Sequence, residues 1–126
     1  MIFGKAKKIK ILIVEDEEDV AKALKVRLKA NGYHPMVATD SVQGVTMAQK
    51  DKPDLVILDI MLPGGGGFAV AERLKQAMDT HDIPIIILTG IPGTEEKAHQ
   101  IGAAFYLRKP YEPEELLGAI KKALEK

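Results

Sequence analysis

The sequence predicts an α/β fold, a doubly wound parallel sheet with helices on both faces. Two observations predict it. Short, almost wholly apolar runs recur along the chain, as in strands buried on both faces, and the clearest are ILIV at 11–14 and IIILT at 85–89. Stretches with apolar residues at helical spacing separate these runs. Because parallel strands must be joined by crossovers, the alternation predicts helices packed on a parallel sheet.

The expected strands are short. They cover residues 9–14, 33–38, 55–59, 83–89 and 105–107. The second strand contains Pro35, which cannot donate a hydrogen bond to a neighbouring strand. We therefore expect that strand near an edge of the sheet.

The expected helices begin at residues that commonly cap helices or occupy their first turn, namely Asp19, Asp40 or Ser41, Thr94 and Pro113. Gly32 suits the end of the first helix. The third helix follows the loop LPGGGG at 62–67, and its apolar stripe runs over 68–78. The fourth is short and ends near Ile101, whereas the last has its apolar residues over 116–124.

Length and composition limit the possible functions. At 126 residues the chain has room for one domain, 1–126, with 1–7 as a flexible lead-in and no effector domain. Equal numbers of basic and acidic residues, 18 each, exclude a general attraction to nucleic acid or to an anionic membrane. The absence of cysteine excludes thiolate chemistry and is compatible with a cytoplasmic location. No signal peptide or run of ~20 apolar residues is present in the sequence.

Polar residues stand where four of the expected strands end. Glu15 and Asp16 follow the first strand, Asp59 ends the third, Thr89 ends the fourth, and Lys109 follows the fifth. In open α/β sheets, ligands bind in the crevice outside the carboxyl ends of the strands. We therefore expect these side chains to form one site.

The residue types indicate phosphoryl chemistry at a metal site. Three carboxylates that converge on one crevice need a cation to remain ionised, and oxygen ligands point to a hard ion such as Mg²⁺. Lys109 offers a point charge for a phosphate, and Thr89 offers a hydroxyl. A carboxylate can act as a covalent nucleophile toward phosphorus, and Asp59 is the natural candidate.

Each of these residues also has an ordinary explanation. Asp59 alone suits a turn, Thr89 alone is a β-branched residue at the end of a strand, and Lys109 alone is a surface lysine before a proline. The run EDEED at 15–19 alone suits a helix N-terminus. Only their joint placement at the strand ends favours a functional interpretation.

The segments VEDEE at 14–18, VILDIMLPG at 56–64, IIILTG at 85–90 and YLRKP at 106–110 resemble the receiver domain of bacterial two-component response regulators, the CheY-like superfamily. The resemblance covers essentially the whole chain and implies a flavodoxin-like sheet in the order 2-1-3-4-5. It implies these site residues: Asp59 as phosphoacceptor; Glu15, Asp16, Asp59 and the Met61 carbonyl as Mg²⁺ ligands; Thr89 and Tyr106 as switch residues; and Lys109 as the phosphate-pairing lysine. It also implies a cis Lys109-Pro110 peptide.

The resemblance further implies partners. A sensor histidine kinase or a histidine phosphotransfer protein would phosphorylate Asp59. A downstream protein would bind the face formed by residues 95–101, 105–107 and 113–124. The domain would act as a monomer or a phosphorylation-dependent homodimer, without direct contact to nucleic acid or membrane. It would be a regulatory domain that promotes its own phosphorylation and dephosphorylation, not an enzyme.

The sequence departs from the family pattern in two places, and other interpretations of the site are open. Gly64 to Gly67 replace bulkier or acidic residues, and Glu15 stands where Asp is common. A receiver-like scaffold that is never phosphorylated is the main alternative. The glycine run also fits a dinucleotide-binding fingerprint, but only weakly, because Pro63 precedes it. An enzyme of the haloacid dehalogenase type is disfavoured, because it would need a second acid where Met61 stands. The three histidines are not spaced as metal ligands, so we expect them at the surface.

Overall fold

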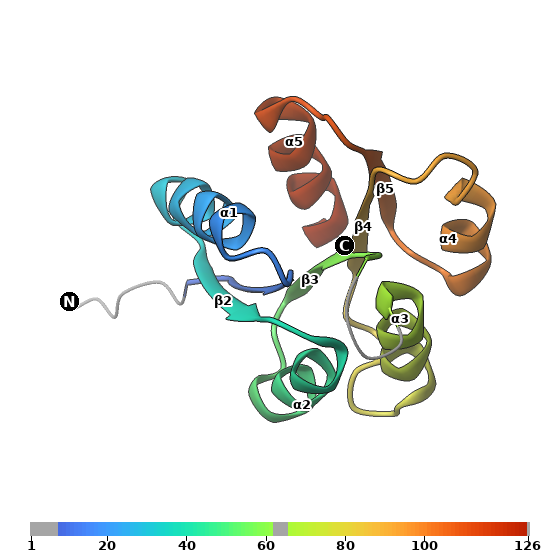
Figure 1. The fold of residues 1–126 in the computed structure, drawn as a ribbon. Helices are drawn as coiled ribbons and strands as arrows, with labels where there is room; N and C mark the ends of the chain where they lie inside the picture. Colours follow the sequence, from blue (N-terminus) through green and yellow to red (C-terminus); the bar gives the residue numbers. More distant parts are fainter. Residues whose placement is uncertain (1–7, 62–65, 126) are drawn as a thin grey trace.

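The computed structural model describes residues 8–61 and 66–125, and the expected lead-in at 1–7 lies outside this part of the chain. Its strands form a single parallel sheet in the order β2-β1-β3-β4-β5 (Figure 1). The strands are β1 Lys10–Val14, β2 His34–Ala38, β3 Leu55–Asp59, β4 Ile85–Thr89 and β5 Phe105–Arg108. The predicted fold class is confirmed, and β2, which contains Pro35, lies at an edge.

Helices cover both faces of the sheet. They are α1 Glu18–Ala30, α2 Ser41–Asp51, α3 Gly66–Gln76, α4 Glu95–Ile101 and α5 Pro113–Leu124. Figure 1 shows α1 and α5 on one face and α2, α3 and α4 on the other. Alternate residues of β1 explain this: Ile11 and Ile13 pack in the core beneath α1 and α5, whereas Leu12 and Val14 belong to the opposite core.

The central strands are buried from end to end. All residues of β3 and β4 are buried, including the polar residues Asp59 and Thr89 at their ends. A strand that is covered by helices on both faces favours a continuous apolar run, which is why the runs could be found in the sequence. The polar residues at the strand ends are thus fixed by rigid elements.

Several boundaries differ from the sequence prediction. The first helix begins at Glu18 with Glu17 as N-cap, so Asp19 lies in its first turn, where an acidic side chain is favoured by the helix dipole. The first strand begins at Lys10, and Ile9 is exposed. The fourth begins at Ile85, after Pro84, whose carbonyl accepts a hydrogen bond from β3.

The third helix ends earlier than its apolar stripe. It stops at Gln76, and Met78 beyond it is 91% exposed, so Met78 was wrongly placed on the buried stripe. A buried bond ends the helix, because the Thr80 hydroxyl donates to the Leu74 carbonyl at 2.7 Å. Such a side-chain bond competes with continuation of the helix, and hydropathy does not report it.

Other local signals are confirmed. Asp40 caps α2, since its carboxylate accepts from the Gln43 N–H at 2.8 Å. Pro113 opens α5, and the Lys109-Pro110 peptide is cis. Thr94 is the N-cap residue of α4, but its side chain makes no capping bond.

The second half of the glycine run belongs to a helix. Gly66 and Gly67 belong to α3, whereas Gly64 and Gly65 lie outside the described residues. The Gly67 N–H donates to the Ile60 carbonyl at 2.7 Å. A Cβ atom at Gly67 would lie 2.3 Å from the Asp59 carbonyl oxygen and 2.7 Å from the Ile60 Cα. Glycine at 67 therefore lets the first turn of α3 rest directly on the backbone at the end of β3.

We predict that Gly67→Ala lowers the free energy of unfolding by about 2–3 kcal/mol, because the added methyl group forces backbone atoms apart. Gly118→Ala is the control: it lies in the exposed face of α5 with nothing near its Cβ position, so it should stabilise by about 0.5–1 kcal/mol. Urea unfolding measures both. Equal effects of the two substitutions would contradict the close approach.

Candidate functional site

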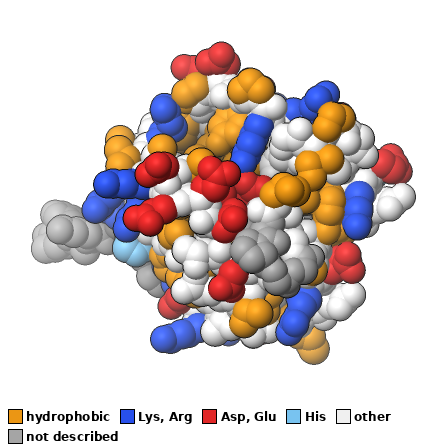
Figure 2. Space-filling model, in the orientation of Figure 1, with side chains coloured by type: hydrophobic (Ala, Val, Ile, Leu, Met, Phe, Trp, Pro, Cys, Tyr) orange, Lys and Arg blue, Asp and Glu red, His pale blue; other side chains and the backbone are white. Residues whose placement is uncertain are grey.

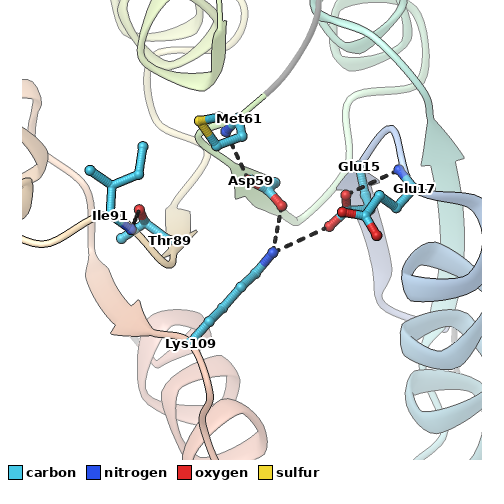
Figure 3. Close-up of polar contacts among 7 residues, drawn as sticks. All are labelled: Glu15, Glu17, Asp59, Met61, Thr89, Ile91 and Lys109. Atoms are coloured by element: carbon cyan, nitrogen blue, oxygen red, sulfur yellow. Dashed lines mark hydrogen bonds and ion pairs between the residues drawn. The ribbon is translucent and has the colours of Figure 1, made fainter.

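The carboxyl ends of the strands bring the predicted polar residues to one edge of the sheet (Figure 3). Glu15 follows β1, Asp59 is the last residue of β3, and Thr89 is the last residue of β4. Lys109 follows β5 directly, and its backbone N–H donates to the Thr89 carbonyl at 2.8 Å. The turn after β5 is thereby tied to the end of β4, which directs the lysine toward β3.

Asp59 is 6% exposed, and both of its carboxylate oxygens are engaged. Oδ1 accepts from the Met61 N–H at 2.8 Å, as in an ordinary turn. Oδ2 accepts from Lys109 Nζ at 2.6 Å. The turn interpretation and the functional interpretation of Asp59 are therefore compatible, because each uses a different oxygen.

Glu15 is the most constrained carboxylate of the site. It is 2% exposed; its Oε2 accepts from the Glu17 N–H at 3.2 Å, and its Oε1 has no hydrogen-bond partner. Lys109 Nζ lies 3.7 Å from this Oε1. Burial, and then the neighbouring Asp59 carboxylate, raise the pKa of Glu15 to about 7, although the Glu17 N–H and Lys109 act in the opposite direction. Two carboxylates thus share one lysine.

Lys109 is held in its charged form. Burial alone would lower the pKa of Lys109, but the hydrogen bond to Asp59 and the charges of Asp59 and Glu15 raise it above its usual value. About a third of its side chain remains exposed. It can therefore bind a group that arrives from solvent without first acquiring a proton.

An open pocket of about 710 Å³ lies in front of Asp59. Its lining residues are Asp16, Glu17, Asp59, Ile60, Met61, Gly66, Gly90, Ile91 and Lys109. Acidic side chains gather at the middle of the face shown in Figure 2, with a basic side chain beside them. The pocket is wide enough for a phosphoryl group and open enough for a second protein to present it.

The donor chemistry of this pocket fits a hard divalent cation. Asp16 and Asp59 line it, exposed and buried respectively. Glu15 does not line it, but its unpartnered Oε1 lies near the same Lys109 ammonium group as Asp59. Across residues 8–61 and 66–125, no three Asp, Glu, His or Cys side chains are gathered into a complete metal site. Mg²⁺ commonly takes one or two carboxylates and keeps several waters, so a partial set of protein ligands is compatible with it.

Thr89 and Tyr106 lie on neighbouring strands. Thr89 is fully buried, and its hydroxyl oxygen accepts from the Ile91 N–H at 2.9 Å. Tyr106 is partly buried on β5, with its hydroxyl 3.0 Å from the Thr94 hydroxyl oxygen. The sequence indicated Thr94 only as a helix start and did not indicate Ile91 at all. No sequence pattern marks such contacts, because they depend on the path of the loop between β4 and α4.

The histidines lie away from the site. His34, His81 and His99 are exposed, as predicted. The ring of His81 lies beside Asp82 at 3.2 Å, in the turn before β4. None of the three lines the pocket in front of Asp59.

The model of the response regulator receiver domain family matches residues 11–121. The chain belongs to this family. Its sequence is 36% identical over 119 residues to the phosphate regulon transcriptional regulatory protein PhoB of Escherichia coli, covering 93% of this chain and 52% of PhoB. The chain thus spans about half the length of the curated relatives it matches.

Solved structures agree with the family assignment. The chemotaxis response regulator CheY4 of Vibrio cholerae superposes with a TM-score of 0.87 at 27% identity, covering 94% of this chain and all of CheY4. A CheY-like receiver domain protein of Methanospirillum hungatei also reaches 0.87, at 28% identity and with 94% of both chains covered. The receiver domain described here is therefore a regulatory signalling domain rather than a classical enzyme.

Within the described residues, each helix of this receiver domain is too short or too polar to cross a membrane.

We predict that Mg²⁺ raises the melting temperature of the protein, because a ligand that binds only the folded state stabilises it by about 2.7 kcal/mol at a hundred times its Kd. Asp16→Asn should reduce the rise, since Asp16 is an exposed carboxylate at the pocket rim. Glu72→Gln, which changes an exposed acid on α3, should leave it unchanged. A thermal titration with Mg²⁺ checks this. An identical rise in all three proteins would place the ion elsewhere.

Proposed function

We propose that this receiver domain accepts a phosphoryl group on Asp59 from the phosphohistidine of a sensor kinase or a histidine phosphotransfer protein, and that the modification switches a protein-binding face. The observation that carries the proposal is the environment of Asp59. Its carboxylate is anchored through Oδ1, faces an open pocket, and has a charged lysine 2.6 Å from Oδ2. An ordinary turn aspartate needs neither the lysine nor the pocket.

The reaction is a displacement at phosphorus. A carboxylate oxygen of Asp59 forms a bond to phosphorus as the phosphorus–nitrogen bond to the donor histidine breaks, and the electron pair leaves on the imidazole nitrogen. Met61 holds Oδ1 in place through its N–H, so the nucleophile needs little reorientation. Lys109 can turn from Oδ2 to an oxygen of the arriving group and neutralise charge there.

Mg²⁺ is the cofactor of the proposed reaction. The ligands would be Glu15, Asp16, Asp59 and the Met61 carbonyl, the set that the family resemblance implies. When bound, the ion neutralises negative charge on the phosphoryl oxygens. The support is the donor set itself: carboxylate oxygens around one pocket and a buried Glu15 oxygen without a partner. A cation would also relieve the repulsion between Glu15 and Asp59, which one lysine only partly compensates.

Phosphorylation would act through Thr89. The acyl phosphate carries about two negative charges where the carboxylate carried one, so the site gains about one negative charge and three acceptor oxygens next to the end of β4. Thr89 uses its oxygen to accept from Ile91, so its hydroxyl hydrogen is available to a phosphoryl oxygen. Reorientation of Thr89 would shift the loop that leads to α4 and change the environment of Tyr106. This is a two-state element that a local change of charge biases.

The face that changes would be formed by α4, β5 and α5, over residues 95–101, 105–107 and 113–124. The support is the weak anchoring of α4: it has seven residues, and Ala98 is its one buried residue. A helix held by so little apolar contact can move at small cost. The target on this face would be a protein, and the domain would act in the cytoplasm as a monomer or a phosphorylation-dependent homodimer.

We predict that incubation with acetyl phosphate and Mg²⁺ adds the mass of one phosphoryl group, and that Asp59→Asn or removal of Mg²⁺ abolishes the gain. Asp82→Asn is the matched control, because Asp82 is a highly exposed aspartate far from the pocket. Intact mass spectrometry gives the answer. If no protein gains mass, beryllofluoride is added as a stable phosphoryl mimic and its binding is followed by ¹⁹F NMR. Binding would show that the phosphoryl group is lost by rapid hydrolysis. Failure to bind would favour the unphosphorylated scaffold.

We predict that Lys109→Gln slows phosphorylation by at least about tenfold, because it removes the positive group that faces the transferring phosphoryl. Lys50→Gln changes an exposed lysine on α2 and should leave the rate unchanged. The rates are read from the same mass measurement at short times. Equal rates for both variants would remove Lys109 from the reaction.

A further inference from the structure

Hydrogen bonds form an unbroken path from the end of β4 to β5. The Thr89 hydroxyl oxygen accepts from the Ile91 N–H at 2.9 Å. The carbonyl of the same Ile91 accepts from the Thr94 hydroxyl at 3.0 Å. The Thr94 oxygen in turn lies 3.0 Å from the Tyr106 hydroxyl. Three links thus connect the side chains of Thr89 and Tyr106, on neighbouring strands, through Ile91 and Thr94.

The direction of each bond follows from the number of hydrogens. A hydroxyl has one hydrogen to donate, and a carbonyl can only accept. Thr94 therefore uses its hydrogen on Ile91, so Tyr106 must donate to Thr94. Thr89 only accepts in this path, and its own hydrogen is left for another acceptor. Within this path, the Thr89 hydroxyl hydrogen is the one hydroxyl hydrogen that is not used.

The Thr94 side chain takes part in this path instead of capping α4. It is the N-cap residue of α4, a position at which a threonine side chain normally accepts a bond from the first turn. Its side chain makes no such bond, and its φ of −95° and ψ of 0° differ from an extended N-cap. The hydroxyl is instead directed back to Ile91 and across to β5.

Ile91 connects this path to the phosphorylation pocket. It is 37% exposed and lines the pocket in front of Asp59, next to Gly90. The loop residue therefore contacts the space that a phosphoryl group would enter. Its N–H and its carbonyl are both fixed by hydroxyl groups, so movement of Thr89 releases one of the two restraints.

We propose that Thr94 is a positioning residue that holds Ile91 and Tyr106 in the resting arrangement and couples them to the state of Asp59. The proposal rests on the proposed function. When the Thr89 side chain rotates to bring its hydroxyl to a phosphoryl oxygen, its oxygen moves away from the Ile91 N–H, and the loop moves. Thr94 moves with the loop, and Tyr106 loses its acceptor. Removing the Thr94 hydroxyl therefore favours the activated arrangement before any phosphoryl group is present.

The first experiment tests the path in the protein alone, without Mg²⁺ or phosphoryl mimic. NMR follows the Ile91 amide and the Tyr106 ring in Thr94→Val and Tyr106→Phe. Thr94→Val should displace both signals, Tyr106→Phe should shift Ile91 in the same direction, and Thr94→Ser, which keeps the hydroxyl, should restore the wild-type spectrum. Thr46→Val on α2 and Tyr33→Phe before β2 are matched controls and should leave the Ile91 amide unchanged.

The second experiment tests the coupling. Beryllofluoride with Mg²⁺ is titrated into each full-length variant and followed by ¹⁹F NMR. Tyr106→Phe should bind up to about fivefold more tightly, the shift expected from loss of one hydrogen bond that favours the resting state. Thr94→Val removes that bond and the bond to the Ile91 carbonyl, so it should bind at least as tightly as Tyr106→Phe. The double variant should gain no more than Thr94→Val, because that variant already lacks the bond to Tyr106. Thr94→Ser should bind as the wild type does.

The outcomes separate the two proposals. An unchanged Ile91 amide in Thr94→Val would overturn the path itself, whatever the phosphorylation result. Displaced signals with unchanged beryllofluoride affinity would overturn the coupling and leave Thr94 a structural residue. Failure of the wild type to bind beryllofluoride would instead overturn the proposed function, and the coupling with it.

Discussion

The contact between Lys109 and Asp59 is the interaction on which the site depends. Glu15 and Asp59 are both almost fully buried at the end of adjacent strands, and one lysine faces both, at 3.7 Å and 2.6 Å. Without it, burial and mutual repulsion would drive one carboxyl group to its neutral form, a tendency already visible in the raised pKa of Glu15. The lysine reaches this position because it follows β5 directly and its N–H is bonded to the end of β4.

The backbone around Asp59 serves the fold and the site at once. The Oδ1 bond to the Met61 N–H closes the turn after β3, and the Gly67 N–H bond to the Ile60 carbonyl seats α3 against the same turn. Because α3 approaches so closely that a Cβ at residue 67 would overlap the Asp59 carbonyl, the helix and the carboxylate share one rigid frame. A site built on rigid elements keeps its geometry more exactly than one built on loops. The glycine run is therefore not uniformly a loop, as its composition suggested.

The sequence was sufficient to predict the structure where the burial of apolar residues alone decides it. The buried runs of β3 and β4 and the helical stripes follow from burial alone, so the fold class and the gathering of Asp59, Thr89 and Lys109 could be predicted. The strand order came from the family resemblance, since burial does not distinguish the possible orders. Prediction was wrong where weak local forces compete, as at Asp19 and at Met78, where the Thr80 bond to Leu74 ends the helix. The hydrogen bond between Thr94 and Tyr106 could not be predicted. The sequence marks Thr94 as a helix-capping residue, and the same hydroxyl can either cap the helix or bond to another strand.

The energies of these contacts suit a switch. A neutral hydrogen bond contributes about 0.5–1.5 kcal/mol, and one to a charged group about 1.5–3 kcal/mol. In the resting arrangement Thr89 and Thr94 accept two neutral bonds, from Ile91 and Tyr106. A single charge-assisted bond from Thr89 to a phosphoryl oxygen is of the same size as the two bonds it would displace. One covalent change at Asp59 would then offset the two resting bonds and bring the two arrangements to comparable populations. The lightly anchored α4 is the element that can follow at low cost, because Ala98 is its one buried residue.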